Sequence, residues 1–332
     1  MFSMHKVANA AGVSKVPTNF LDIILRTGTG AAVTTATPSP LNLSNNGGLI
    51  LTKNYNGTNS WSIVDTVRGI SSDLDMSSTA AATTQSTGIT AISPTGYSTG
   101  TLAKRNGNVL QLVDYVMRQG PRFLQIIQRT EPGYPSRIAH NLGVTPGFII
   151  AKSTTLTHGW YGWHALPDQF GRSEPSAGFS VDSTAAPRYI SGADVDASIF
   201  SNDIYSWNGS IENCAYSGGN VIYYVFGHDT SPSGRIRCGA YTGNGAAEGP
   251  IVNLGWSPRL LIIKNRSAAG DWVVIDTLRG FTTGNDQFQA FNSAAPQTAV
   301  QYADPTLTGF QIKGTAANVN TRDSTYLYVA FR

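Results

Sequence analysis

Short apolar runs separated by turn-forming residues recur along the whole chain, and this pattern predicts strands. Examples are LLIIK at 260–264, WVVID at 272–276 and YLYVAF at 326–331, in a chain where Gly, Asn and Pro bound such runs. Short apolar runs with these boundaries are typical of strands in a buried sheet. Turn signals recur about every 8–12 residues, so we expect an all-β fold of β-sandwich or jelly-roll domains.

One phrase of the sequence occurs twice and aligns without a gap. LILTKNYNGTNSWSIVDTVRG stands at 49–69, and LLIIKNRSAAGDWVVIDTLRG stands at 260–280. A third, more diverged copy, FIIAKSTTLTHGWYGWHALP, lies between them at 148–167 and has His164 where the other two have Asp. Repetition on this scale indicates a domain-sized unit, so function has to be sought in an array rather than in one active site.

Phrases on either side of this core extend the repeat. FLDIILRTGTG at 20–30 resembles FLQIIQRTEPG at 123–133, and each copy ends on a strand-like phrase such as YLYVAFR. We therefore predict three tandem β domains after a short N-terminal arm, residues 1–19, that orders on assembly. The predicted domains are β repeat 1 at 20–120, β repeat 2 at 121–232 and β repeat 3 at 233–332. Each has the usual size of a domain that buries its own core. The sequence leaves open whether the three form a pseudo-threefold unit or a linear array.

The phrase Trp-x-x-x-Asp-x-x-Arg-Gly predicts a structural corner. Residues four apart on a strand share a face, so Trp61 and Asp65 point the same way, and Arg68 can return to pair with Asp65. The following Gly permits a positive φ where the strand ends. A catalytic interpretation would need a second carboxylate facing the first, as in glycoside hydrolysis, and the repeat supplies only one. The predicted structural anchors of the repeats are Trp61, Asp65, Arg68, Trp160, Trp272, Asp276 and Arg279.

A lysine follows the apolar run in all three copies, as Lys53, Lys152 and Lys264. We expect strand-end lysines whose alkyl stems cover the sheet while their ammonium groups reach water. The alternative is that these lysines contact another subunit or bind an anionic ligand.

The second copy departs most from the pattern and is rich in aromatic residues. Aromatic side chains at loop or strand-edge positions can stack on sugar rings or contact a protein. The candidate binding surface consists of Tyr161, Trp163, His164 and Trp207. The alternative is that these side chains fill the core of this unit in a different way.

Composition and charge argue against several classes of function. Charged residues make up 13% of the chain, about half the usual fraction. The net charge of +3 comes without a basic stripe, so we predict no nucleic-acid partner. No apolar run reaches the length of a membrane span. The histidines show no metal-ligand spacing and the few Glu residues are scattered, so we expect no enzyme activity, no metal and no cofactor.

The two cysteines, Cys214 and Cys238, flank the junction of the second and third units. The N-terminus lacks the apolar segment of a signal peptide, which predicts synthesis in a reducing cytosol. We therefore expect free thiols, with a disulfide between the two as the alternative.

Several phrases of the repeat resemble those of bacteriophage virion proteins. They are FLxIIxRT-x-x-G, HNLGVTPGFIIAK, NLGWSPRLLIIKNRSAAGDWVVIDTLRG, the small STAA element and a terminal strand like YLYVAFR. Similar repeats occur in tailed-phage proteins of the tail-fibre and minor-structural type. The resemblance covers nearly all of residues 20–332, and its most specific parts are 47–69, 140–152 and 252–280. The chain departs from it where the second copy lacks the Asp and the Arg-Gly, and where the first copy lacks NLG-x-x-P.

The resemblance implies a β-rich virion part that is not an enzyme. The expected function is that of a structural protein of the phage tail, as a fibre, baseplate or adaptor component that acts through assembly surfaces. Its expected partners are other copies of itself and neighbouring virion proteins. A second interpretation is a host-receptor or glycan-binding module of the virion, and a third is a capsid head-decorating protein. The expected location is the virion, after synthesis in the host cytoplasm.

Overall fold

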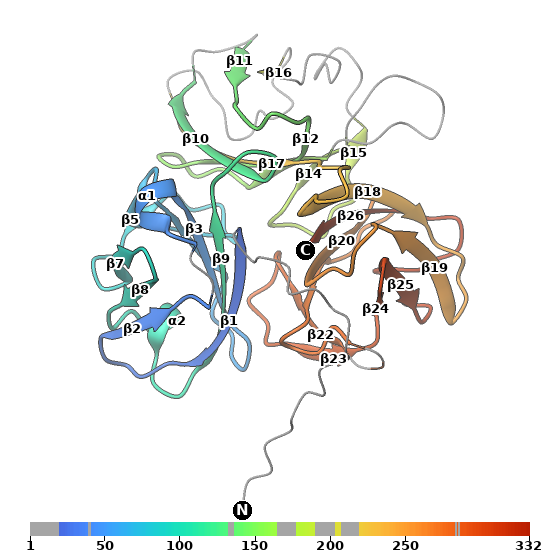
Figure 1. Cartoon of the computed structure of the whole chain (residues 1–332), viewed down its shortest axis with the longest axis horizontal. Coiled ribbons are helices and arrows are strands. Elements are labelled where there is room, and N and C mark those ends of the chain that lie inside the picture. Colours follow the sequence, from blue (N-terminus) through green and yellow to red (C-terminus); the bar gives the residue numbers. More distant parts are fainter. Residues whose placement is uncertain are drawn as a thin grey trace, which may run out of the picture.

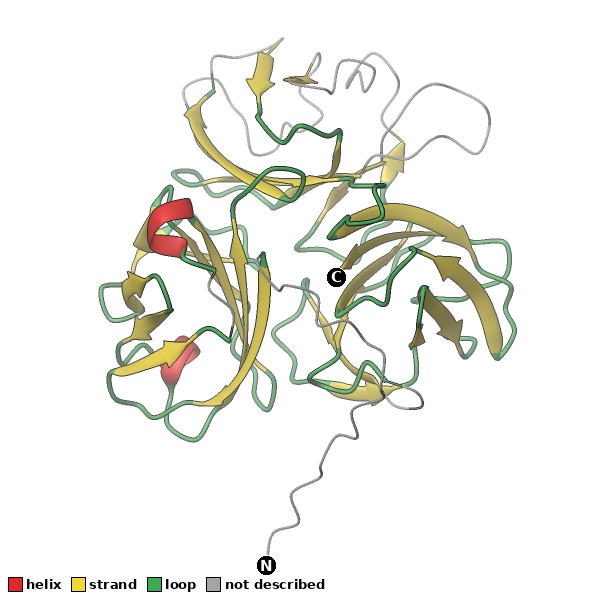
Figure 2. Cartoon of the chain, in the orientation of Figure 1, coloured by secondary structure: helices red, strands yellow, loops and turns green. Residues whose placement is uncertain are grey.

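Strands make up nearly all the regular structure of this protein (Figure 2). The computed structural model describes residues 20–38, 41–131, 136–164, 177–189, 203–206, 219–282, 284 and 286–332. The helices α1 (Leu43–Asn46) and α2 (Ala103–Asn106) are single turns. No helix in these ranges is long and apolar enough to cross a membrane. The prediction of an all-β fold is confirmed.

Three antiparallel six-stranded sheets form the body of the molecule, and their strand orders correspond (Figure 1). In each sheet the first strand lies at an edge, the last strand in chain order lies beside it, and the other four follow in chain order. Each sheet takes all its strands from one of the three stretches that the repeats delimit.

Sheet 1 consists, in spatial order, of β1 (Leu21–Thr27), β9 (Gln111–Arg118), β3 (Gly48–Asn54), β4 (Ser62–Asp65), β5 (Gly69–Asp75) and β6 (Thr83–Thr84). Sheet 2 consists of β10 (Leu124–Thr130), β17 (Asn220–Gly227), β12 (Pro146–Ser153), β13 (Tyr161–His164), β14 (Ala177–Ser180) and β15 (Arg188–Tyr189). Sheet 3 consists of β18 (Ile236–Thr242), β26 (Thr325–Phe331), β20 (Leu260–Asn265), β21 (Trp272–Asp276), β22 (Asp286–Ala290) and β23 (Thr298–Val300).

A smaller sheet packs against the outer face of each large one, which makes each unit a sandwich. Sheet 1 carries β2 (Val33–Ala36), β8 (Gly96–Thr99) and β7 (Ile89–Ser93). Sheet 2 carries β11 (Ser136–Ala139) and β16 (Asp203–Ser206). Sheet 3 carries β19 (Glu248–Asn253), β25 (Gly309–Lys313) and β24 (Ala303–Thr306).

The central strands of the large sheets are buried on both faces, and this explains their uninterrupted apolar runs. In β9, Val113, Tyr115 and Met117 belong to the core at the centre of the molecule, whereas Leu112 and Val116 point to the opposite face. Because neighbouring positions alternate between two buried faces, both faces of the strand carry apolar side chains. Its sequence therefore shows no alternation of apolar and polar residues.

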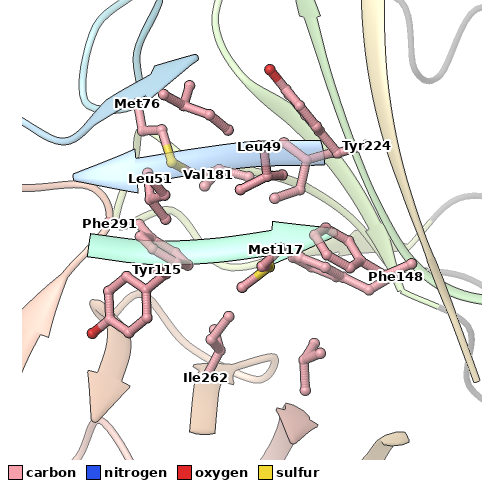
Figure 3. Packing of buried hydrophobic residues seen from close by; sticks show 14 of the residues in the cluster. Leu49, Leu51, Met76, Tyr115, Met117, Phe148, Val181, Tyr224, Ile262 and Phe291 are labelled. Carbon is pink, nitrogen blue, oxygen red and sulfur yellow. The ribbon is translucent and has the colours of Figure 1, made fainter. Parts of the chain in front are cut away.

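The inner faces of the three sheets surround one shared core (Figure 1, Figure 3). Leu49 from sheet 1, Phe148 from sheet 2 and Ile262 from sheet 3 belong to this core, and all three line a central cavity of about 30 Å³. Aliphatic and aromatic side chains form the whole lining, and apolar cavities of this kind stay dry. The three units thus close into a pseudo-threefold body rather than a linear array. Only the outer layers have separate cores, so the predicted separate core of each unit is found in part.

Candidate functional site

The repeated residues meet where the large sheets adjoin, so these interfaces are the first place to look for function. We call them interfaces 1–2, 1–3 and 2–3 after the sheets that they join. Each contains a tryptophan that is buried and donates its indole N–H to a backbone carbonyl of the neighbouring unit. Trp61 of sheet 1 donates to Ala290 O at 2.7 Å, and Trp160 of sheet 2 donates to Asp75 O at 2.7 Å. Trp272 of sheet 3 donates to Ser180 O at 3.0 Å, which closes the ring of three interfaces.

The three repeated lysines follow the same cyclic pattern. Lys53 Nζ donates to Ala294 O of the third unit at 3.0 Å, and Lys152 Nζ donates to Thr79 O of the first unit at 3.0 Å. Lys264 Nζ donates to Thr184 O of the second unit at 3.1 Å.

The prediction that these ammonium groups reach water is wrong, because all three lysines are fully buried. Burial lowers the pKa of Lys53 and of Lys264 to about 8. For Lys53 the nearby charge of Arg279 acts in the same direction. The carbonyl oxygens take the place of water around the ammonium groups, which is how a lysine can be buried here. The three lysines instead join neighbouring units of the same chain.

The predicted pairing of Asp and Arg across the corner is present in both complete copies. Arg68 Nε lies 2.6 Å from Asp65 Oδ2, and Arg279 Nε lies 2.6 Å from Asp276 Oδ2. The other carboxylate oxygen of Asp65 accepts the backbone N–H groups of Val67 and Arg68, which caps the turn. The glycines that follow, Gly69 and Gly280, have φ values of 92° and 108°, which side-chain-bearing residues rarely adopt.

Each of these ion pairs also holds a tyrosine from the neighbouring sheet, which the sequence pattern did not identify. The hydroxyl of Tyr224 in sheet 2 donates to Asp65 Oδ2 at 2.8 Å and accepts from Arg68 Nη2 at 3.1 Å. In the same way, Tyr115 in sheet 1 donates to Asp276 Oδ2 at 2.7 Å and accepts from Arg279 Nη2 at 2.7 Å. Interfaces 1–2 and 1–3 therefore share one triad of Asp, Arg and Tyr.

Burial and the neighbouring groups both shift the pKa values of the side chains in these triads. Burial opposes the charge of Arg68, but Tyr224 and Asp65 outweigh it and raise the pKa of Arg68. Burial raises the pKa of Tyr224 and of Tyr115 well above the usual value, so both phenols stay protonated and can donate. A group held in one protonation state by a complete set of partners is suited to structure rather than to proton transfer.

Interface 2–3 lacks the triad. His164 stands where the other copies have Asp, and its Nε2 donates to the backbone carbonyl of Tyr328 in sheet 3 at 2.9 Å. The position in β26 that corresponds to Tyr115 and Tyr224 is Val329, which belongs to the apolar core. Comparing the last strands of the three units would have pointed to the missing partner, because the Asp and the Tyr are absent together.

Two of the four residues of the candidate aromatic surface in the second copy are not at a surface. Trp163 and His164 are buried, and Trp163 packs in the outer core of sheet 2. Tyr161 is half-buried and packs against the same core. Trp207 lies outside the described residues. The prediction of an exposed stacking platform at Trp163 and His164 is therefore wrong, and the alternative of a differently filled core applies to them.

The remaining titratable and nucleophilic groups of the described residues do not form a metal-binding cluster. Within the described ranges, no three His, Cys, Asp or Glu side chains gather as a metal ion would need. Cys238 is a free thiol, and its burial raises the pKa of the thiol, while Cys214 lies outside the described residues. Asp286 is fully buried, and desolvation raises its pKa to about 7 although the backbone N–H groups of Tyr302 and Ala303 donate to its Oδ2.

Comparison with known families places the chain in one of them. A family described as a domain of unknown function (DUF7483) matches it twice, at residues 16–122 and at residues 123–332. The chain therefore belongs to this family. The boundary between the two matches falls between β9 and β10, where sheet 1 ends and sheet 2 begins. No curated protein matches the sequence.

Proposed function

We propose that this chain is a structural protein of a tailed-bacteriophage virion. Its place is in the tail, as a fibre, baseplate or adaptor component, and it acts through its outer surface rather than through a catalytic pocket. The observation that carries the proposal is the use of the repeated side chains. Trp, Lys, Asp and Arg recur between copies, and they join the sheets inside the molecule. The resemblance of the repeats to phage virion proteins supplies the biological setting.

The physical character of the body supports the same proposal. The three sheets share one core, and the buried Asp and Arg at interfaces 1–2 and 1–3 form ion pairs. Such a body resists local opening because no unit can separate without exposing part of the shared core. A particle that persists outside the cell requires this property, and an assembly component uses symmetry and surface for its function.

The decisive experiment locates the chain on the particle. Antibodies raised against the purified protein are applied to virions of the phage that encodes it, and the label is viewed by negative-stain electron microscopy. Label on the tail is the expected result, whereas label on the head would replace the tail assignment with that of a decoration protein. Absence of the chain from purified particles by mass spectrometry would refute the virion proposal altogether.

A second experiment tests the mode of assembly. The mass of the purified chain in solution is measured by light scattering, with and without residues 1–19. An oligomer that dissociates when residues 1–19 are removed is expected for a virion component held by its arm. A monomer in both forms would overturn self-assembly and leave attachment to a different virion protein.

The glycan-binding alternative has lost much of its basis. It relied on aromatic side chains of the second unit, of which Trp163 and His164 are buried. No observation on the described residues now favours it over assembly.

A further inference from the structure

Asparagine stands directly before glycine at four places in the described part of the chain, and such pairs are prone to lose ammonia. The pairs are Asn46–Gly47, Asn56–Gly57, Asn106–Gly107 and Asn244–Gly245. The reaction begins when the backbone nitrogen of the glycine attacks the side-chain amide carbon of the asparagine and closes a five-membered succinimide ring. Glycine favours this step because it has no side chain to hinder the approach. Which pair reacts in the folded protein therefore depends on whether the glycine nitrogen is free.

Hydrogen bonds occupy the glycine nitrogen in two of the four pairs. Gly47 N donates to Leu43 O at 2.9 Å, and Gly107 N donates to Ala103 O at 2.7 Å. Each bond closes a helical turn, so the nitrogen cannot reach a side-chain carbon without breaking that turn. Asn106 is in addition fully buried. These two pairs are therefore protected by the fold.

The second pair in chain order is open to the reaction. Within the described residues, Gly57 N donates to no acceptor, and Asn56 is exposed with its Nδ2 likewise without an acceptor. The fourth pair differs, because Asn244 Nδ2 donates to Glu248 O at 3.0 Å and Asn244 Oδ1 accepts from Ala246 N at 2.9 Å. An amide held at both ends turns less readily toward the attacking nitrogen. Asn56 is therefore the asparagine best placed to react.

Two donors already point at the amide oxygen of Asn56. Gln111 N donates to Asn56 Oδ1 at 2.9 Å, and Asn54 Nδ2 donates to the same oxygen at 3.3 Å. Attack by the glycine nitrogen makes the amide carbon tetrahedral and places negative charge on this oxygen. Donors that are fixed at such an oxygen in advance stabilise the charge as it develops. These contacts therefore favour the reaction at Asn56.

The loop that contains Asn56 also joins the first unit to the third. Lys53 Nζ donates to three backbone carbonyls of this loop and to Ala294 O of the third unit. Tyr55 O accepts from Gln297 N of the third unit at 2.9 Å. A change in the course of the backbone at Asn56 therefore displaces contacts of interface 1–3.

We propose that Asn56 is a site of spontaneous deamidation in the folded protein, and that its conversion weakens interface 1–3. Gly57 N forms a bond to Asn56 Cγ, the Cγ–Nδ2 bond breaks, and the proton of Gly57 N passes through water to the departing nitrogen, which leaves as ammonia. One water molecule then opens the succinimide at either of its carbonyl groups, which yields aspartate or isoaspartate. Isoaspartate adds one carbon to the backbone and moves the loop carbonyls away from Lys53.

The third unit provides a comparison within the molecule. In the gapless alignment of the two copies, Ser267 stands where the first unit has Asn56. The corresponding lysine contact, from Lys264 Nζ to Thr184 O, therefore has no reactive amide at this position of its loop. The site rests on the geometry of one loop and not on the place of the chain in a virion, so its failure would leave the assembly proposal intact.

The first test compares reaction rates in the folded and the unfolded chain. The full chain is incubated in mildly alkaline buffer with and without guanidinium chloride, and deamidation of each pair is followed by peptide mapping with mass spectrometry. Asn56 is expected to react about as fast in the folded chain as in the unfolded one, whereas folding slows Asn106 by at least about tenfold. Protection of Asn56 to the same degree as Asn106 would overturn the proposal. Faster reaction of Asn244 than of Asn56 in the folded chain would overturn the choice of site.

The second test measures the effect on interface 1–3, with Asn56→Ser as the matched control because it carries the residue of the third unit. Hydrogen exchange is compared between fresh and aged samples of the parent and of the variant. Exchange in the segment around Gln297 is expected to rise by about tenfold in the aged parent and to stay unchanged in the aged variant. Unchanged exchange in the aged parent would overturn the link to interface 1–3. An equal rise in the aged variant would assign the effect to another residue and overturn the role of Asn56.

Discussion

Interfaces 1–2 and 1–3 each contain a buried Asp–Arg ion pair, whereas interface 2–3 has His164 at the place of the Asp, although all three have the same tryptophan and lysine contacts. The ionic interfaces each bury an Asp, an Arg and a Tyr, with Tyr224 and Tyr115 as the tyrosines. At interface 2–3, His164 meets a backbone carbonyl, Val329 occupies the place of the tyrosine, and the Trp272 ring packs 4.6 Å from that of Phe179. The comparison teaches that the triad changes as a unit, because one unpaired charge in a core is strongly destabilising.

Loss of the interface tryptophan should have the largest effect, and interface 2–3 should be the most sensitive to it. Trp272→Ala removes a fully buried ring and leaves the carbonyl of Ser180 without its donor. We expect a loss of about 3–5 kcal/mol from the ring alone. Because the indole joins two sheets, hydrogen exchange should increase in β14 as well as in β21, and not in the third unit alone.

Trp272→Phe provides the control for this variant, since it keeps a ring and removes the N–H. It should lose about 1–3 kcal/mol, the contribution of one buried hydrogen bond. Near-native stability of Trp272→Ala in urea denaturation would contradict a buried anchor.

Replacing one member of an Asp–Arg–Tyr triad should lower the free energy of unfolding almost as much as the loss of the tryptophan. Asp276→Asn keeps the acceptor for the backbone N–H groups of the turn but leaves Arg279 buried without its counter-charge. We expect a loss of about 3–5 kcal/mol in the free energy of unfolding, measured with urea.

The triple variant Asp276→Asn, Arg279→Met, Tyr115→Phe sharpens this comparison, because it removes the Asp–Arg–Tyr triad from interface 1–3 and leaves the lysine contact, as at interface 2–3. It should be more stable than Asp276→Asn alone, since replacing a complete buried charge group by apolar residues is often neutral. A triple variant less stable than the single one would show that the ion pair adds net stability.

Asp286 contrasts with Asp276 in the same sheet. Asp276 pairs with Arg279, whereas the partners that the described residues show for the Asp286 carboxylate are backbone N–H groups. Its folded-state pKa of about 7, raised by desolvation, exceeds the usual 3.8. The protonated group therefore favours folding fully below pH 4, and this contribution is lost as the pH rises towards 7. The slope should be about 1.4 kcal/mol per pH unit across that range, or roughly 4 kcal/mol in total.

Asp286→Asn should flatten this part of the pH profile of stability, measured by thermal unfolding in buffers from pH 4 to pH 8. The amide oxygen can still accept one of the backbone N–H groups of Tyr302 and Ala303. An unchanged slope in the variant would assign the pH dependence to other groups.

Removal of a tyrosine hydroxyl from a triad should lower the stability less than the other changes described above. Tyr115→Phe and Tyr224→Phe each remove one hydroxyl that bonds to a carboxylate and to a guanidinium group. We expect about 1.5–3 kcal/mol for each, as for other hydrogen bonds to charged groups. Because the two lie at different interfaces, the losses should add in the double variant. Strong non-additivity would mean that the two ionic interfaces communicate through the shared core.

Local pattern predicted the strands and the corner well. The apolar runs became strands of doubly buried sheets, and Asp65 pairs with Arg68 three residues on, since both relations depend on neighbours in sequence. The partners of these groups could not be predicted in the same way. Tyr224 reaches Asp65 from another unit, 159 residues away, and no local periodicity records such a contact.

The lysines and the aromatic residues of the second copy show the same limit of prediction from local sequence. Lys53 was expected in water because a lysine at a strand end usually is. It is buried because the third unit brings Ala294 O to its ammonium group. Trp163 is a candidate for a surface because its segment departs from the repeat, with core filling as the alternative, and the structure places it in the outer core of the second unit.

The sequence by itself determined the all-β class and the Asp–Arg corners, because each is encoded within one strand or one turn. Only the tertiary structure decided that the units close around a shared core and that the repeated residues join them. These outcomes depend on how the three sheets pack against one another. That packing is driven by the burial of apolar sheet faces, which come from distant parts of the chain.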